Sequence, residues 1–131
     1  MTILVTGSRS IISQNLVDQA CDTFVLESNK RGLNKFSCLK HGAARGVDTL
    51  TADWAKRHGI EPVPFPAKWD IYGKSAGFKR NQEMIDSGFD VMLAIRCIGK
   101  SNGTDHCIRQ AKLTGKPIFL YKENGEYEWL Q

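Results

Sequence analysis

The feature that most constrains this chain is the alternation of short apolar runs with longer segments of helical periodicity. The apolar runs, rich in β-branched residues, predict five strands at residues 2–6, 36–40, 61–65, 90–95 and 117–121. The segments between them predict helices at residues 12–27, 47–58, 79–87 and 105–114. Strands that alternate with helices at this spacing argue for a parallel sheet covered on both faces.

Local signals refine this pattern. Ser13 is placed to cap the first helix, and the prolines of residues 61–65 favour an edge strand. Residues 66–78 are expected to be irregular, and the Asn-Gly pair in the tail suggests a small hairpin. We find no repeat or linker in the 131 residues. The sequence therefore predicts a single α/β domain, residues 1–131, with a Rossmann-like parallel sheet of about five strands and helices on both faces.

Composition narrows the function classes. No apolar run is long enough to span a bilayer, and the N-terminus lacks the features of a signal peptide. The four cysteines are spread out and the histidines form no cluster, so we expect reduced thiols, a cytoplasmic protein, no metal and no resident cofactor. The net charge of +4 permits an anionic ligand without selecting one.

In an open α/β sheet the ligand lies beyond the carboxyl ends of the strands. Four loops are expected there: residues 7–9, 41–48, 66–80 and 99–104. Each loop contributes glycine or polar side chains. Backbone N–H groups could approach an anion closely at the glycines of these loops, Gly7, Gly42, Gly46 and Gly103. The alternative is that these glycines only form tight turns, which is favoured for any one of them. Four together favour a ligand.

The charged residues of these loops have two interpretations. Arg45 could grip a phosphate. Asp48 could accept hydrogen bonds from a ribose, but a carboxylate in the first turn of a helix is also favourable for structural reasons, and this second interpretation is slightly favoured. Arg80 and Asn81 either form solvated surface or contact a phosphate.

The aromatic residues Trp69 and Tyr72 either stack on a base or plug the sheet edge. Two nucleotide-binding motifs are excluded. "YGKSAG" and "GKSNGT" lack the first glycine of a Walker A loop, and "GSRSII" does not supply G-x-G-x-x-G. The chain is therefore neither a P-loop ATPase nor an ordinary NAD dehydrogenase.

Four segments in this order resemble the SLOG superfamily, in particular its YspA/YpsA-related branch: "VTGSR", "HGAARGVDTLTADWA", "FPAKWDIYGKSAGFKRNQEM" and "SNGTDHCIRQAKLTGKPI". The resemblance runs from Ile3 to about Phe119. It implies a Rossmann-like fold that binds nucleotides or nucleotide-derived signals. "GAARGVD" is also similar to a segment of the DNA-processing protein DprA.

The LOG branch of this superfamily contains phosphoribohydrolases, which cut the N-glycosidic bond of nucleoside monophosphates. Their signature is an Arg-Lys pair followed by P-G-G-x-G-T-x-x-E. Here Arg80 matches the arginine, Asn81 replaces the lysine, and Gly103-Thr104 match the Gly-Thr. Cys107 replaces the catalytic glutamate, and a cysteine cannot activate water as a carboxylate does. Substitute carboxylates would have to come from Asp48, Glu83 or Asp105.

Three functions remain open. The leading one is a sensor or sequestering protein for a nucleotide-derived small molecule, such as an ADP-ribose derivative. The second is an N-glycosidic hydrolase, and the third, a single-stranded nucleic-acid binder, is disfavoured by the mild charge. Related domains often pair through helix faces, so a homo-oligomer is expected to be feasible, and no membrane partner is expected. The candidate ligand-binding residues are Gly7, Ser8, Arg9, Gly42, Ala43, Arg45, Gly46, Asp48, Trp69, Lys74, Arg80, Asn81, Asn102, Gly103 and Thr104.

Overall fold

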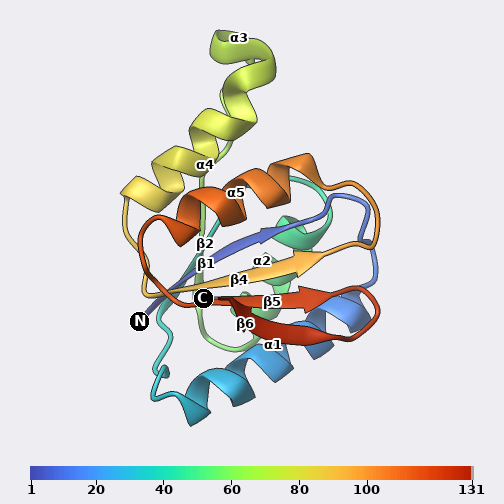
Figure 1. Ribbon diagram of the computed structural model, residues 1–131, viewed down its shortest axis with the longest axis vertical. Coiled ribbons are helices and arrows are strands. Elements are labelled where there is room, and N and C mark those ends of the chain that lie inside the picture. Colours follow the sequence, from blue (N-terminus) through green and yellow to red (C-terminus); the bar gives the residue numbers. More distant parts are fainter. Residues whose placement is uncertain (131) are drawn as a thin grey trace.

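A six-stranded sheet forms the centre of the molecule in the computed structural model, which describes residues 1–130 (Figure 1). The strand order is β3-β2-β1-β4-β5-β6, and all neighbours are parallel except β5 and β6, which are antiparallel. The predicted α/β, Rossmann-like class is confirmed. The strands are β1 (Thr2–Gly7), β2 (Cys38–His41), β3 (Glu61–Pro64), β4 (Val91–Arg96), β5 (Ile118–Lys122) and β6 (Tyr127–Leu130).

Helices cover both faces of the sheet. Helices α1 and α2 lie on one face and α4 and α5 on the other, while α3 projects beyond the body of the molecule (Figure 1). The helices are α1 (Gln14–Lys30), α2 (Val47–Arg57), α3 (Trp69–Tyr72), the 3-10 turn η1 (Gly73–Ser75), α4 (Ala76–Asp86) and α5 (Asn102–Lys112).

The continuous apolar runs of the inner strands follow from this arrangement. In β1, Ile3 and Val5 pack in the core beneath α1 and α2, whereas Leu4 between them packs beneath α4 and α5. Successive side chains of a strand point to opposite faces, so a strand covered on both faces is apolar at every position. Strand β4 alternates in the same way between Leu93 and Met92.

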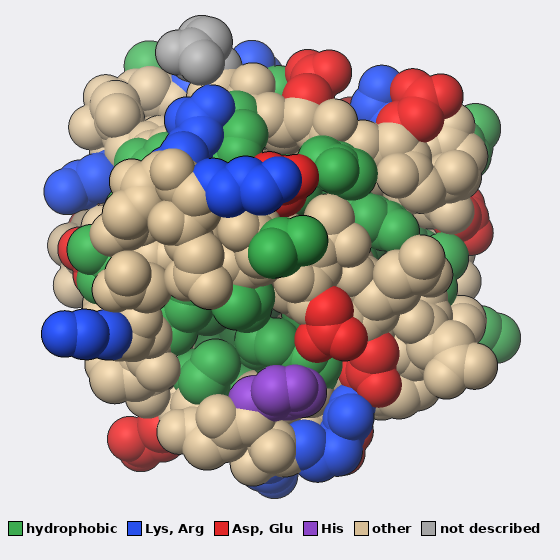
Figure 2. All heavy atoms as spheres, turned by 90° about the horizontal axis from the view of Figure 1, so that it is seen from below, with side chains coloured by type: hydrophobic (Ala, Val, Ile, Leu, Met, Phe, Trp, Pro, Cys, Tyr) green, Lys and Arg blue, Asp and Glu red, His purple; other side chains and the backbone are tan. Residues whose placement is uncertain are grey.

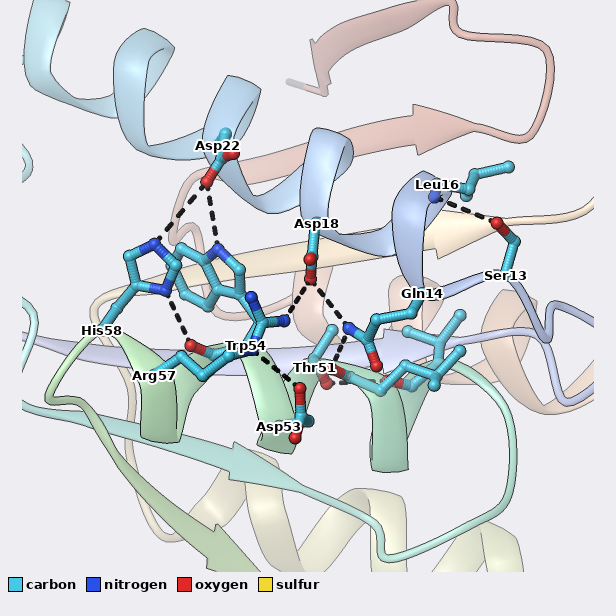
Figure 3. Close-up of polar contacts among 12 residues, drawn as sticks. Ser13, Gln14, Leu16, Asp18, Asp22, Thr51, Asp53, Trp54, Arg57 and His58 are labelled. Atoms are coloured by element: carbon cyan, nitrogen blue, oxygen red, sulfur yellow. Dashed lines mark hydrogen bonds and ion pairs between the residues drawn. The ribbon is translucent and has the colours of Figure 1, made fainter.

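Polar contacts between α1 and α2 tie these two helices together at their solvent side (Figure 3). Asp18 accepts hydrogen bonds from Gln14 and Arg57, at 2.8 and 2.6 Å, and Asp22 accepts one from the indole N–H of Trp54 at 3.1 Å. Trp54 is itself almost fully buried. None of these residues lines the cavity described below, so we assign them a structural role.

Several local predictions are confirmed. The Ser13 side chain accepts a hydrogen bond from the Leu16 N–H at 3.2 Å and caps α1. Strand β3, with its prolines, is an edge strand. The Asn-Gly tail does form a hairpin, with Gly125 at a φ of +93°. This hairpin adds β6, so the sheet has six strands where the sequence predicted about five.

The region between β3 and α4 corrects the sequence prediction. Residues 66–78 were expected to be irregular, but Trp69–Tyr72 and Gly73–Ser75 form helical turns and α4 already begins at Ala76. Likewise α5 begins at Asn102, three residues before the predicted position. Each early turn contains a glycine, Gly77 or Gly103, which is a weak helix former and so does not signal a helix start in the sequence.

The chain departs in opposite directions from β1 and β4, because β2 lies beside β1 and β5 lies beside β4. The carboxyl ends of β1 and β4 therefore form the topological switch point of the sheet. The four cysteines are free, and three of them are buried. Within residues 1–130, no helix is long and apolar enough to cross a membrane, and no group of three or more metal-ligating side chains occurs.

Candidate functional site

A cavity of about 440 Å³ opens at this switch point, between the carboxyl end of β1 and the beginnings of α4 and α5. We call it the inner chamber. Its walls come from all four loops that the sequence singled out. The predicted residues that line it are Gly7, Ser8, Arg9, Arg45, Asp48, Trp69, Lys74, Arg80, Asn81, Asn102, Gly103 and Thr104.

The inner chamber is strongly cationic. Five basic side chains line it, against Asp48 as the one carboxylate: Arg9, Arg45, Lys74, Arg80 and Lys100. None of the five forms a salt bridge within residues 1–130. By contrast, Figure 2 shows both acidic and basic side chains on the face of the molecule that carries α1. Five unpaired cations around one recess favour an anionic ligand.

Asp48 holds the loop that precedes α2. Its Oδ2 accepts hydrogen bonds from the backbone N–H groups of Gly42, at 3.1 Å, and Ala44, at 3.2 Å. Burial raises the pKa of Asp48 to about 6, although these hydrogen bonds and the charge of Arg80 act in the opposite direction. The sequence predicted that backbone N–H groups of this loop would bind a phosphate. The N–H groups of Gly42 and Ala44 instead donate to the carboxylate of Asp48. This geometry supports the structural interpretation of Asp48.

Asp48 nevertheless also faces the ligand space. It lines the inner chamber, and its second oxygen, Oδ1, makes no hydrogen bond to any part of the chain that the structure describes. That oxygen can accept a hydrogen bond from a ligand hydroxyl. The structural interpretation and the ligand interpretation of this residue are therefore compatible.

Internal contacts account for three of the four glycines. Gly46 has a φ of +78°, and a Cβ there would lie 2.7 Å from the backbone of Ser8 and Arg9. A Cβ on Gly42 would overlap the Arg80 guanidinium, and a Cβ on Gly7 would overlap Val47. Only Gly103 has no neighbouring atom within 4 Å. Of the four, Gly103 alone leaves open space for a ligand.

Arg80 and Asn81 are buried, so their interpretation as solvated surface is wrong. Arg80 Nη1 donates to the carbonyl oxygen of Gly42, and its Nε donates to Asn81 Oδ1 at 3.0 Å. Asn81 Nδ2 in turn donates to the carbonyl of Gly103 at 3.3 Å. Burial lowers the pKa of Arg80, which is 8% exposed. Its Nη2 has no hydrogen-bond partner within residues 1–130 and remains available to a ligand.

The N-terminus of α5 is the second electropositive element of the chamber. Its N-cap residue, Ser101, does not cap the helix, because its hydroxyl donates to Thr104 Oγ1 at 2.8 Å and lies 2.7 Å from Ser8 Oγ. The first backbone hydrogen bond of the helix runs from the Asp105 N–H to the Ser101 carbonyl. The N–H groups of the first turn are therefore free of helical partners, and such N–H groups favour anions.

Two aromatic side chains border the chamber. Trp69 is 48% exposed, and the guanidinium carbon of Arg9 lies 5.6 Å from the centre of its ring. Phe78 also lines the chamber and stacks on His106, with ring centres 4.3 Å apart. Tyr72 is not part of the lining and instead lies beneath the Lys79 ammonium group. Trp69 and Phe78 are therefore the two aromatic side chains in the described lining of the chamber.

Only one of the three candidate catalytic carboxylates reaches the chamber. Glu83 is exposed on α4 and does not line it. Asp105 forms two hydrogen bonds with Arg96, at 2.7 and 2.9 Å, and this partner lowers the pKa of Asp105. Asp48 is therefore the single carboxylate that can act on a ligand there.

The sequence predictions and the cavity differ at a few positions. Gly46 lies outside the lining, while Gly42 and Ala43 line a neighbouring cavity. Sequence reasoning named neither Lys100 nor Ser101, although both fall in a loop that it had placed at the ligand. Phe78 was missed because it was assigned to irregular chain.

Comparisons with known proteins identify the family of the chain. The sequence model of the YAcAr family, described as the YspA, cpYpsA-related SLOG family, matches residues 1–72. The chain belongs to this family. The matched part of the SLOG domain runs from β1 to α3 and contains the loops of Gly7 and Asp48.

Two individual proteins extend the comparison. The Gene 61 protein of Mycobacterium phage D29 is 38% identical to this SLOG chain over 125 residues, which cover 91% of the chain and 94% of the phage protein. The X-ray structure of TM1055 matches with a TM-score of 0.60 and 15% identity, over 89% of the chain and 71% of that protein. At this identity the second match supports the fold alone.

Proposed function

We propose that this SLOG protein binds a nucleotide or a nucleotide-derived signal in the inner chamber, as a sensor or a sequestering protein. One observation carries the proposal. Five cationic side chains without salt-bridge partners and a single buried carboxylate line the same recess of about 440 Å³. Recesses of this size suit small molecules, and a donor-rich lining suits phosphate. Membership of the SLOG family supports nucleotide-related binding in general.

Each part of a nucleotide has a matching wall in the chamber. The free N–H groups of α5, together with Lys100, form the site for a phosphate. Trp69 and Phe78 offer faces for a base, and Asp48 Oδ1 can accept a hydrogen bond from a ribose hydroxyl. These groups are enough for a protein that binds the nucleotide without cleaving it.

Titration calorimetry with AMP tests this proposal. Wild-type protein is expected to bind AMP saturably, and Lys100→Gln is expected to weaken binding by about tenfold, because one charge-assisted phosphate contact is lost. Lys112→Gln is the matched control, since Lys112 lies at the other end of α5 and outside the chamber. Equal effects of the two substitutions, or no saturable binding, would contradict the proposal.

A second candidate function is hydrolysis of the ligand's N-glycosidic bond. It is favoured by one observation: Asp48, with a pKa of about 6, lines the chamber and has a free oxygen. A carboxylate of this kind can activate water or stabilise an oxocarbenium-like centre. Mass spectrometry after incubation with nucleotides separates the two functions. A released base that disappears in Asp48→Asn identifies a hydrolase, and an unaltered bound compound identifies a binding protein.

A further inference from the structure

A second cavity, of about 430 Å³, lies beside the inner chamber. We call it the outer chamber. Its own walls are formed by Gly42, Ala43, Pro66 and Ala67, which come from the loops after β2 and β3. Ala43 has a φ of +57°, which is uncommon for a residue other than glycine. Nothing in the function proposed so far uses this space.

The two chambers meet at a shared boundary. Arg9, Ala44, Arg45, Trp69 and Arg80 line both cavities. The boundary therefore contains three arginines and one large aromatic ring. Among residues 1–130, no carboxylate lines the outer chamber, and Asp48 is the only one that lines the inner chamber.

The three boundary arginines are free to bind an anion. None of them takes part in a salt bridge within the described chain. Arg9 and Arg45 are exposed, and Arg80 is buried with an unused Nη2. Arg9 and Arg45 can each contact two phosphate oxygens at once, and Arg80 adds the N–H donors of its Nη2. Together these groups provide donors for two linked phosphates.

Size leads to the same conclusion. Either chamber alone falls within the range of small-molecule sites, about 300–1,000 Å³. A mononucleotide bound in the inner chamber would leave the outer chamber filled with water. A ligand with an organic group at each end would use both chambers, and its middle would lie at the arginines.

We propose, resting on the proposed function, that the ligand is a two-ended molecule whose organic halves are joined by a diphosphate or longer phosphate bridge. The phosphate nearest the inner half lies at the N-terminus of α5, and the rest of the bridge lies against Arg9, Arg45 and Arg80. One half occupies the inner chamber beside Asp48, and the other occupies the outer chamber beside Ala67. Trp69, which faces both chambers, separates the two halves.

Titration calorimetry with AMP, ADP and NAD, a two-ended diphosphate, tests the proposal in three proteins. Ala67→Phe fills the outer chamber only, and Gly103→Val fills the inner chamber only, where the added atoms meet open space. Wild-type protein is expected to bind NAD at least about tenfold more tightly than ADP, because the second half adds buried contacts. Ala67→Phe is expected to remove this advantage while leaving the ADP affinity within about twofold. Gly103→Val is expected to weaken both ligands.

The outcomes separate the two proposals. Equal affinities for NAD and ADP in wild-type protein, or an NAD affinity that Ala67→Phe leaves unchanged, would overturn the two-chamber ligand while the nucleotide site stands. Failure of AMP, ADP and NAD alike to bind would overturn both. Retained ADP binding by Ala67→Phe also shows that this variant is folded.

Discussion

The buried carboxylate of Asp48 is the residue that most connects stability with function. It is 6% exposed and holds two backbone N–H groups, yet its raised pKa of about 6 shows that its ionised form is disfavoured in the fold. A charge that costs stability at neutral pH, and that also faces a cavity, is typical of a functional group. A purely structural acceptor could equally be a neutral amide.

Replacement by that neutral amide gives the first prediction. Asp48→Asn keeps an acceptor for the Gly42 and Ala44 N–H groups and removes the buried charge, so at pH 8 it is expected to raise the free energy of unfolding by about 2 kcal/mol. The same substitution is expected to weaken nucleotide binding. Chemical denaturation and calorimetry measure the two effects. A variant that is destabilised at pH 8 would contradict this account.

The pH dependence of that difference gives the second prediction. Between the unfolded pKa of 3.8 and the folded pKa of about 6, the native protein binds a proton that the unfolded chain does not bind. Asp48 therefore stabilises the fold as the pH falls through this window. The advantage of Asp48→Asn is expected to be full above about pH 6 and to vanish near pH 4. A constant difference across denaturation curves from pH 4 to 8 would show that Asp48 does not titrate in this way.

Cys107 illustrates a residue that is conspicuous in the sequence and inert in the structure. It is fully buried, and burial raises the pKa of its thiol to about 11. We expect a thiol-reactive dye to label Cys38, the one half-buried cysteine, in native protein and all four cysteines after unfolding. Rapid labelling of Cys107 in native protein would contradict its packing role.

At the scale of the element, the start of α2 depends on a close approach between the backbone at Gly46 and the backbone of Ser8 and Arg9. Gly46 combines a φ of +78° with a 2.7 Å approach to Ser8 and Arg9, whereas Gly59, just after α2, has a φ of +72° and open space. Gly59→Ala is expected to cost about 1 kcal/mol, from the left-handed conformation alone. Gly46→Ala is expected to cost at least about 1 kcal/mol more, because the Ser8–Arg9 backbone must also move. Equal losses in thermal unfolding would show that the close approach is unimportant.

The same scale shows what the sequence could and could not predict. The apolar runs located β1, β4 and β5 because a strand buried on both faces has no polar position to obscure it. The starts of α4 and α5 were missed because each first turn contains a glycine, which is a weak helix former. The position of the cavity at the strand ends followed from the topology alone. The hydrogen bonds from the Gly42 and Ala44 N–H groups to Asp48 could not be predicted from the topology, because they depend on the conformation of a loop.

At the scale of the whole molecule, five cationic side chains meet where the sheet changes direction. The chain carries a net charge of only +4, and five unpaired cations surround the inner chamber. This arrangement favours a small anion in a recess over an extended polyanion along a surface. A single-stranded oligonucleotide is therefore expected not to displace bound ADP at physiological ionic strength. Competitive displacement in fluorescence anisotropy would instead favour nucleic-acid binding.

The most direct measurement is a two-dimensional ¹H–¹⁵N NMR titration of the protein with ADP. The amide signals of Asn102, Gly103 and Thr104 are expected to shift most, together with those of Arg9 and Arg45, while the signals of the β5–β6 hairpin stay in place. Saturation of all shifting signals at one ADP concentration would establish a single site at the switch point. Shifts confined to another surface, or no shifts at high ADP concentration, would contradict the claim that this cavity is the nucleotide site.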